Sequence, residues 1–163
     1  MPQVAMPHVY LTMAMIAVAF LSVYAVSLVV DYVNLRCEEA TLSAIASELS
    51  ARLSEVYAMV NLTPLEEVFV YREVDLPVEV NHKPYEVAFE NEEGVWYVVA
   101  YLATRNFTRG KAPLTLLVRP QTEPINLPDN VIFAHPLKSN VGKPVVWAWK
   151  SSGEVSVGFG YSG

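Results

Sequence analysis

The chain has 163 residues, of which 53% are hydrophobic, and its 17 acidic and 11 basic residues give a formal net charge of −6. This length allows one globular domain, but the hydrophobic content is too high for an ordinary soluble domain, so some apolar surface must meet a partner other than water. The acidic balance argues against nucleic acid as a partner, because nucleic acid requires clustered Lys and Arg. The single cysteine, Cys37, excludes an internal disulfide; we expect a small buried residue, with an intermolecular bridge as the alternative.

A long N-terminal helix is the first element that the sequence predicts. Residues 8–30 carry no formal charge, and these 23 residues, at ~1.5 Å rise each, would cross the ~30 Å hydrocarbon core of a bilayer. Neither Gly nor Pro occurs between Pro7 and Pro64. Pro7 suits a first helical turn, and residues 61–64 supply polar side chains and a stop, so we expect one continuous helix within residues 1–61.

The second half of this helix, residues 31–61, is amphipathic. Its apolar side chains recur at seven-residue spacing with three- and four-residue offsets, which is typical of a helix face that packs on a neighbour. We expect this face to pack on the chain's own globular part, with a self-associating coiled coil as the alternative. Glu38 interrupts the stripe, so continuous packing should start near Leu42. The residues of the predicted helix-to-head contact are Leu42, Ile45, Leu49, Leu53, Val56 and Val60.

From residue 64 onward the chain reads as β structure. This part holds all seven glycines and nine of the eleven prolines, and it is rich in Val, Tyr, Phe and Trp. Predicted strands cover residues 67–74, 85–90, 95–103, 114–119, 131–134, 144–150 and 154–161, with residues 77–80 as an extension. Residues 95–102 are apolar on both faces, which predicts a central strand covered on both sides. The predicted fold is α+β: a hydrophobic-then-amphipathic helix over residues 1–61, then an antiparallel, Ig-like β-sandwich head over residues 62–163.

Three glycines have a predicted conformational role. Gly94 should supply the positive φ of the turn between the strands at 85–90 and 95–103. Gly158 and Gly160 share one face of the last predicted strand, which allows another backbone or a ring to approach closely.

Catalytic and metal-binding patterns are not found in the sequence. It contains no nucleophile elbow, phosphate-binding glycine loop or zinc-protease motif, so we expect no enzyme, no catalytic residues and no cofactor. The histidines lack metal-ligand spacing and predict ordinary surface or loop positions; they are His8, His82 and His135. Carboxylates cluster at the tip of a predicted hairpin, at Glu90, Glu92 and Glu93. They favour a solvated turn, with a weak cation site as the alternative.

Two segments match the acceptor pattern for N-glycosylation. The candidate acceptors are Asn61 and Asn106, each followed two residues later by Thr, and both are expected in loops or at the ends of elements. A glycan at either position would place that region outside the cytoplasm.

This arrangement resembles the archaeal type IV pilins and archaellins, whose subunits join an N-terminal hydrophobic helix to a β-rich head. The resemblance is one of architecture and covers the whole chain, with residues 7–60 matching the helix and residues 65–163 matching the head. The glutamate near the mature N-terminus of bacterial pilins has no counterpart, because no Glu precedes Glu38.

The resemblance implies that the helix leaves the membrane and bundles with its copies in the core of a filament used for adhesion or motility. A helix that is apolar all round is satisfied equally by lipid or by identical helices. The implied partners are further copies of the chain, the membrane before assembly, the pilus assembly machinery and glycans. The implied location is an extracellular filament with a membrane-inserted precursor. The residues expected in the filament core are Tyr10, Leu11, Met15, Val18, Phe20, Leu21, Tyr24 and Leu28.

The competing interpretation is a single-pass accessory protein, similar to the stator-like components of archaeal motility machines. In that case the apolar segment stays in lipid and the β-sandwich binds a partner. The two interpretations differ in one observable, which is whether the particle is a helical polymer.

Overall fold

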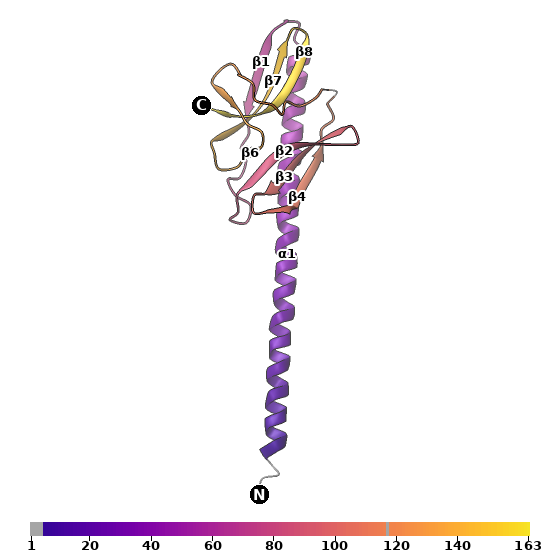
Figure 1. The fold of residues 1–163 in the computed structure, drawn as a ribbon, viewed down its shortest axis with the longest axis vertical. Helices are drawn as coiled ribbons and strands as arrows, with labels where there is room; N and C mark the ends of the chain where they lie inside the picture. The colour runs from indigo at the N-terminus through magenta and orange to yellow at the C-terminus, as the bar shows by residue number, and fades with distance from the viewer. Residues whose placement is uncertain (1–4, 117) are drawn as a thin grey trace. The chain divides into compact units, whose positions relative to one another are not determined.

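The structure is a computed structural model that describes residues 5–116 and 118–163. Within these residues it has one helix and eight strands (Figure 1). The predicted α+β fold is confirmed, because a long N-terminal helix is followed by two antiparallel sheets of four strands each. The elements are α1 (Ala5–Leu62), β1 (Val68–Glu73), β2 (Tyr85–Glu92), β3 (Val95–Leu102), β4 (Arg105–Pro113), β5 (Val131–Phe133), β6 (Leu137–Lys138), β7 (Lys143–Ser151) and β8 (Glu154–Ser162).

Helix α1 has the length that the missing glycines and prolines allow. Its end is closed by local hydrogen bonds: Thr63 Oγ1 donates to the carbonyl of Met59 at 2.7 Å, and Thr63 N donates to that of Val60 at 3.3 Å. Pro64 follows and cannot continue the helix, since it lacks an amide hydrogen. These contacts satisfy carbonyls that the last turn would otherwise leave unpaired.

The chain divides into two compact units, and the division lies inside α1. One unit is Met1–Cys37 and the other is Glu38–Gly163. The second unit, which we call the head, therefore contains residues 38–62 of the helix as well as both sheets. The sequence had suggested a boundary at residues 61 and 62, where the helix ends.

The head is built from two four-stranded sheets. Their strand orders are β1-β7-β8-β5 and β4-β3-β2-β6, and all pairings are antiparallel. Two-residue turns join β2 to β3 and β7 to β8, and both turn residues have positive φ in each case: 52° and 87° at Glu93 and Gly94, 53° and 86° at Ser152 and Gly153. Such turns match the twist of the strands that they connect. Gly94 therefore has its predicted role.

The core of the head lies between α1 and the two sheets. Seven hydrophobic helix residues are at most 5% exposed: Leu42, Ile45, Ala46, Leu49, Leu53, Val56 and Val60. They form one cluster with buried side chains of both sheets, such as Val98 of β3 and Val157 of β8. The rings of Phe89 and Phe159 stack across the sheets with centroids 4.2 Å apart. All six residues of the sequence-predicted helix-to-head contact thus lie in this core, and their stripe is occupied within the chain.

The backbone of strand β4 packs directly against the backbone of α1 at Gly110. A Cβ atom added to Gly110 would lie 2.0 Å from the amide nitrogen of Ser43 and 2.2 Å from the carbonyl carbon of Leu42. Nearby, the Ser50 hydroxyl donates to the carbonyl of Pro113 at 2.7 Å. Only glycine leaves room for this approach.

The outer face of the first sheet carries a smaller cluster around Trp147. Its indole lies over Gly158, where an added Cβ would be 2.4 Å from Cζ2, and its Nε1 donates to the carbonyl of Phe159 at 2.9 Å. A Cβ on Gly160 would lie 2.6 Å from the carbonyl oxygen of Ile132. The expected close approach to these glycines by a ring and a backbone is therefore present.

Several strand predictions were wrong. Residues 105–113 form β4, although no strand was predicted there and Asn106 was expected in a loop or at the end of an element. The predicted strand at 114–119 is absent over the described residues 114–116 and 118–119. Residues 77–80 add no strand, since Val80 makes only an isolated bridge with Lys83. The two-residue strand β6 was not predicted. Edge position explains β4, because an edge strand with one solvated face tolerates alternate charged residues.

Because helix residues form part of the core, the structure predicts which truncated fragments will fold. A fragment that starts at Pro64 loses the seven buried hydrophobic helix residues. Truncation of one large buried side chain to Ala costs about 2–5 kcal/mol, whereas the free energy of unfolding of a whole domain is about 5–15 kcal/mol. We expect this fragment to remain unfolded and a fragment that starts at Glu38 to unfold cooperatively. Circular dichroism during heating distinguishes them, and a cooperative transition in the shorter fragment would contradict the shared core.

The close approach at Gly110 predicts a second effect. Gly110→Ala should destabilise the head by about 1–3 kcal/mol, because the clashing atoms belong to the helix backbone and cannot rotate away. Denaturant unfolding of the variant measures this loss. Phe107→Ala on the same strand is the control; Phe107 is 71% exposed, so its stability should stay within about 0.5 kcal/mol of the parent.

Candidate functional site

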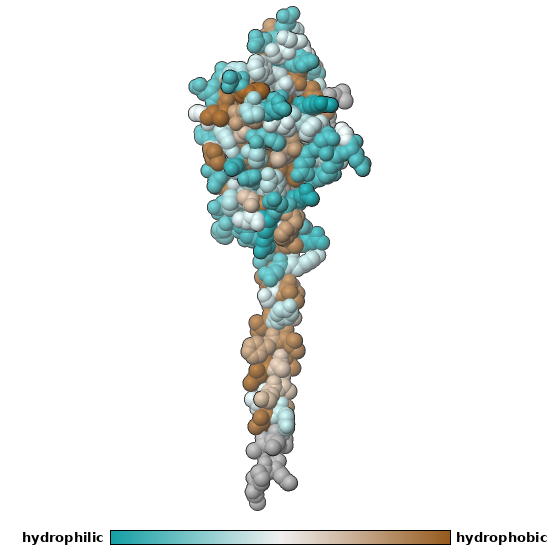
Figure 2. Space-filling view, viewed as in Figure 1, coloured by the Kyte–Doolittle hydropathy of each residue, from teal (hydrophilic) through white to brown (hydrophobic). Residues whose placement is uncertain are grey.

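The first unit presents an apolar surface around the whole helix. Every side chain from residue 8 to residue 34 is exposed, and Figure 2 shows brown, hydrophobic side chains along the visible face of this segment. The eight residues expected in a filament core are 52–73% exposed: Tyr10, Leu11, Met15, Val18, Phe20, Leu21, Tyr24 and Leu28. Exposed apolar area of this extent marks a surface that is covered in the working protein.

Two hydroxyl groups on this surface bond to the helix itself. Thr12 Oγ1 donates to the carbonyl of His8 at 2.8 Å, and Ser22 Oγ donates to that of Val18 at 2.9 Å. A hydroxyl without a partner would cost roughly 2–7 kcal/mol on transfer from water to an apolar environment. These internal bonds allow Thr12 and Ser22 to enter a dry environment without a polar partner from outside the helix.

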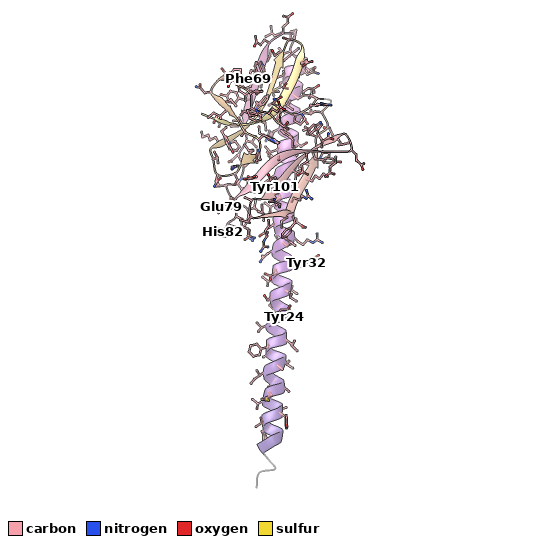
Figure 3. The ribbon with its side chains drawn as sticks, viewed as in Figure 1. Tyr24, Tyr32, Phe69, Glu79, His82 and Tyr101 are labelled. Atoms are coloured by element: carbon pink, nitrogen blue, oxygen red, sulfur yellow. The ribbon has the colours of Figure 1, made fainter. Side chains whose placement is uncertain are left out.

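A polar pair, Tyr32 and Arg36, follows the apolar segment. The Arg36 Nε–H donates to the Tyr32 hydroxyl at 3.1 Å, and the guanidinium carbon lies 5.3 Å from the centroid of that ring. Figure 3 labels Tyr32 on this stretch of the helix, and Tyr24 within the apolar segment that precedes it. Amphipathic aromatic and arginine side chains are typical of the boundary between an apolar medium and water. By length and composition, α1 is the one helix of the described residues able to cross a membrane.

The head begins on the helix with a buried carboxylate. Glu38 is 3% exposed, and its Oε1 accepts hydrogen bonds from Lys83 Nζ at 2.5 Å and Asn81 Nδ2 at 2.7 Å. Both donors lie on a tight hairpin turn. Asn81 and His82 have φ of 50° and 58°, and the backbones of Val80 and Lys83 exchange hydrogen bonds of 2.9 and 3.0 Å. Figure 3 marks this turn by its labels for Glu79 and His82.

The surroundings of Glu38 keep it ionised. Burial alone raises the pKa of the carboxyl group, but hydrogen bonds from Lys83 and Asn81 and the charges of Lys83 and Arg105 outweigh it, so the pKa lies below its ordinary value. A buried, ionised carboxylate is tolerated when donors satisfy it as they do here. The turn at 80–83 is thereby fixed to one position on the helix.

Sequence reasoning had treated Glu38 as a break in the apolar stripe. In the structure Glu38 makes a specific polar contact at the first position of the head, and the packed apolar stripe begins four residues later at Leu42. Its donors are 43 and 45 residues away in the chain. Cys37, expected to be buried, is instead exposed.

The two candidate glycosylation acceptors differ in their surroundings. Asn61 is exposed in the last turn of α1, at the end of an element as expected, whereas Asn106 is exposed on strand β4 and not in a loop. Thr108, the hydroxyl residue of the second pattern, is 0% exposed, and its Oγ1 has no hydrogen-bond partner in the described part of the chain.

The remaining polar candidates are engaged in the head. Glu92 pairs with Lys111, and Glu90 lies 3.6 Å from Arg109, so neighbouring cations already neutralise part of the acidic hairpin tip. His135 is half-buried, and its Nε2 accepts the amide hydrogen of Phe89 at 3.1 Å; burial lowers its pKa. Among residues 5–116 and 118–163, no group of three or more His, Cys, Asp or Glu is placed to hold a metal ion.

Comparison with protein-family models, with curated proteins and with solved structures found no match to this chain.

The contact at Glu38 predicts a pH-dependent contribution to stability. At pH 7, Glu38→Gln should destabilise the head by about 2 kcal/mol, since it leaves charged donors with a weaker acceptor. Because the folded pKa lies below the ordinary value of 4.5, this contribution is complete above that value and is lost as the pH falls through the folded pKa. Unfolding free energies between pH 7 and pH 2 should therefore converge for parent and variant.

The matched control is Glu48→Gln, on the same helix. Glu48 pairs with Arg52, and both side chains are more than 40% exposed, so this variant should stay within about 0.5 kcal/mol of the parent. Parallel pH curves for the parent and Glu38→Gln would contradict the role assigned to Glu38.

Proposed function

We propose that this chain is the structural subunit of an extracellular filament similar to type IV pili, which polymerises through its apolar N-terminal helix and serves surface adhesion. The observation that carries the proposal is the fully exposed apolar surface over residues 8–30, whose side chains find no cover in the described part of the chain. A globular protein of this size does not leave such an area in water.

The energetics favour sister helices as the cover outside the membrane. Burial is worth roughly 25 cal/mol per Å² of apolar area, so removal of these side chains from water would hold many subunits together. Contacts between copies that do not close into a ring generate a helical polymer. The hydroxyls of Thr12 and Ser22, bonded to their own helix, place no polar requirement on the neighbouring copy.

The packing of the head supports the proposal that only the apolar N-terminal segment contacts other copies. Its stripe from Leu42 to Val60 is used up in its own core, so the helix residues that remain available for other copies are mainly those before Glu38. We propose that lipid covers this apolar segment before assembly, that a pilus-type machinery transfers it into the polymer, and that the head faces outward.

An anchored accessory protein, whose apolar segment stays in lipid and whose head binds a partner, is the alternative function. It shares the membrane-inserted state with the pilin precursor. The two functions differ after release from the membrane, where the anchored protein would be found only in detergent extracts.

Val18→Asp tests the proposal in cells. Val18 is 62% exposed near the centre of the apolar segment, and an Asp at the centre of a membrane helix costs about 2.5–3.5 kcal/mol, with a comparable or larger cost in a dry helix bundle. We expect sheared surface material from the parent strain to contain filaments with this chain as the main band by mass spectrometry. The variant strain should yield no filaments by negative-stain microscopy.

Two controls make the result decisive. Val18→Leu keeps the segment apolar and should assemble normally. An immunoblot of the membrane fraction should show the Val18→Asp chain present, so that lost insertion is separated from lost assembly. Normal filaments from Val18→Asp, or a parent chain confined to detergent extracts, would reject the filament proposal.

A further inference from the structure

The outer face of the sheet β4-β3-β2-β6 carries a small hollow. Alternate residues of these strands face the core, and the residues between them form a second, solvent-facing surface of charged and aromatic side chains. The hollow has a volume of about 370 Å³ and is lined by Ala88, Phe89, Glu90, Tyr101, Asn106 and Arg109. This volume lies at the lower end of ligand sites in general, which are roughly 300–1,000 Å³.

The strand register explains why the surface is hollow here. Ala88 of β2 lies directly opposite Val99 of β3, so two short side chains meet at this point of the sheet. Longer side chains surround them, because Tyr101 follows two residues after Val99 and lies opposite Arg109 of β4. Glu90 closes the other side, two residues after Ala88. The apolar lining residues are Ala88 and Phe89, whose ring stacks on Phe159 in the core, and the other four lining residues carry polar groups.

The Tyr101 ring forms a fixed flat wall. Its hydroxyl donates to Glu86 Oε2 at 3.1 Å, which holds the ring in one orientation, and the side chain is partly exposed. Figure 3 labels this residue on its sheet. An aromatic ring that lines a hollow attracts apolar C–H groups and offers a large contact area at little entropic cost.

The polar rim carries both signs of charge. Glu90 and Arg109 approach to 3.6 Å, with 38% and 54% of their side chains exposed, so both heads remain within reach of a ligand. One supplies hydrogen-bond acceptors and the other donors, and the Asn106 amide supplies both. The net charge of these groups is zero, so a charged ligand would meet a like charge as well as an opposite one, whereas an uncharged ligand rich in hydroxyl groups meets no repulsion.

We propose that this hollow binds one or two sugar rings of a neutral saccharide. A pyranose combines an apolar C–H face, which would stack on Tyr101, with a rim of hydroxyl groups, which would bond to Glu90 and Arg109, and to Asn106 in a chain without a glycan at that position. The inference goes beyond the proposed filament, because the site lies within one head and needs no polymer. It supplies a ligand class for adhesion if the filament assembles.

Saturation-transfer NMR on the full chain tests the site directly. The chain is solubilised in a detergent without a sugar head group, and the probes are maltotriose, cellotriose, chitotriose and mannotriose, with trigalacturonate as the anionic comparison. We expect transfer to at least one neutral probe. Tyr101→Ala should reduce that signal about tenfold, and Glu90→Gln and Arg109→Gln should each reduce it several-fold.

The matched control is Tyr97→Ala, on the same strand and the same face. The Tyr97 ring is covered by Lys111 Nζ, 4.0 Å from its centroid, and it does not line the hollow, so this variant should keep the parent signal. Thermal unfolding of each variant shows whether its head is intact. If Tyr101→Ala fails to fold, the Glu90→Gln and Arg109→Gln variants decide the question.

Three results would overturn the saccharide site. They are no transfer to any neutral probe, a neutral signal that the folded hollow variants leave unchanged, and transfer confined to trigalacturonate. Because the measurement uses dispersed chains in detergent, its failure leaves the filament proposal untouched, and a failure of filament assembly leaves the binding measurement valid.

Discussion

Burial of one helix stripe by two sheets is the interaction on which the head depends. Neither sheet contains a full core of its own, since Leu42, Leu49, Leu53 and Val56 lie at the centre of the cluster that joins them. The approach of β4 to backbone distance at Gly110 and the pairing of Glu55 with Arg72 of β1 hold both sheets to this helix. Since α1 runs without interruption from Ala5 to Leu62, one element supplies both the core of the head and the exposed apolar surface.

The first buried contact along α1 within the head is ionic, and this has a structural reason. An apolar stripe by itself tolerates a slip by one turn, because residues at three- and four-residue spacing replace one another. A slip of one turn, about 5.4 Å, would carry Glu38 away from Lys83 and Asn81 and leave buried charge without a partner. The buried carboxylate thus selects one register, while the leucines supply most of the stabilisation.

The sequence was informative where local rules decide the structure. The absence of Gly and Pro predicted the helix, its stripe identified Leu42 and its partners as apolar contacts, and Gly94 marked a hairpin. It misled where tertiary partners decide: β4 carries Arg109 and Lys111 on a solvated face and resembles a loop, and the partners of Glu38 come from more than 40 residues away. The hollow beside Tyr101 depends on the register of three strands, which no local pattern in the sequence encodes.

Because Thr108 is buried in the folded head, the two acceptor patterns are accessible to a glycosylating enzyme at different stages of folding. An enzyme that recognises the Thr108 hydroxyl can reach it only while β4 is unpaired with the rest of the head, because the folded structure covers it completely. Any sugar on Asn106 must therefore be attached before the head closes, and transfer at this position competes with folding. Thr63 is only partly covered, although its hydroxyl is bonded to a carbonyl of the last helical turn, and Asn61 is exposed in the folded head.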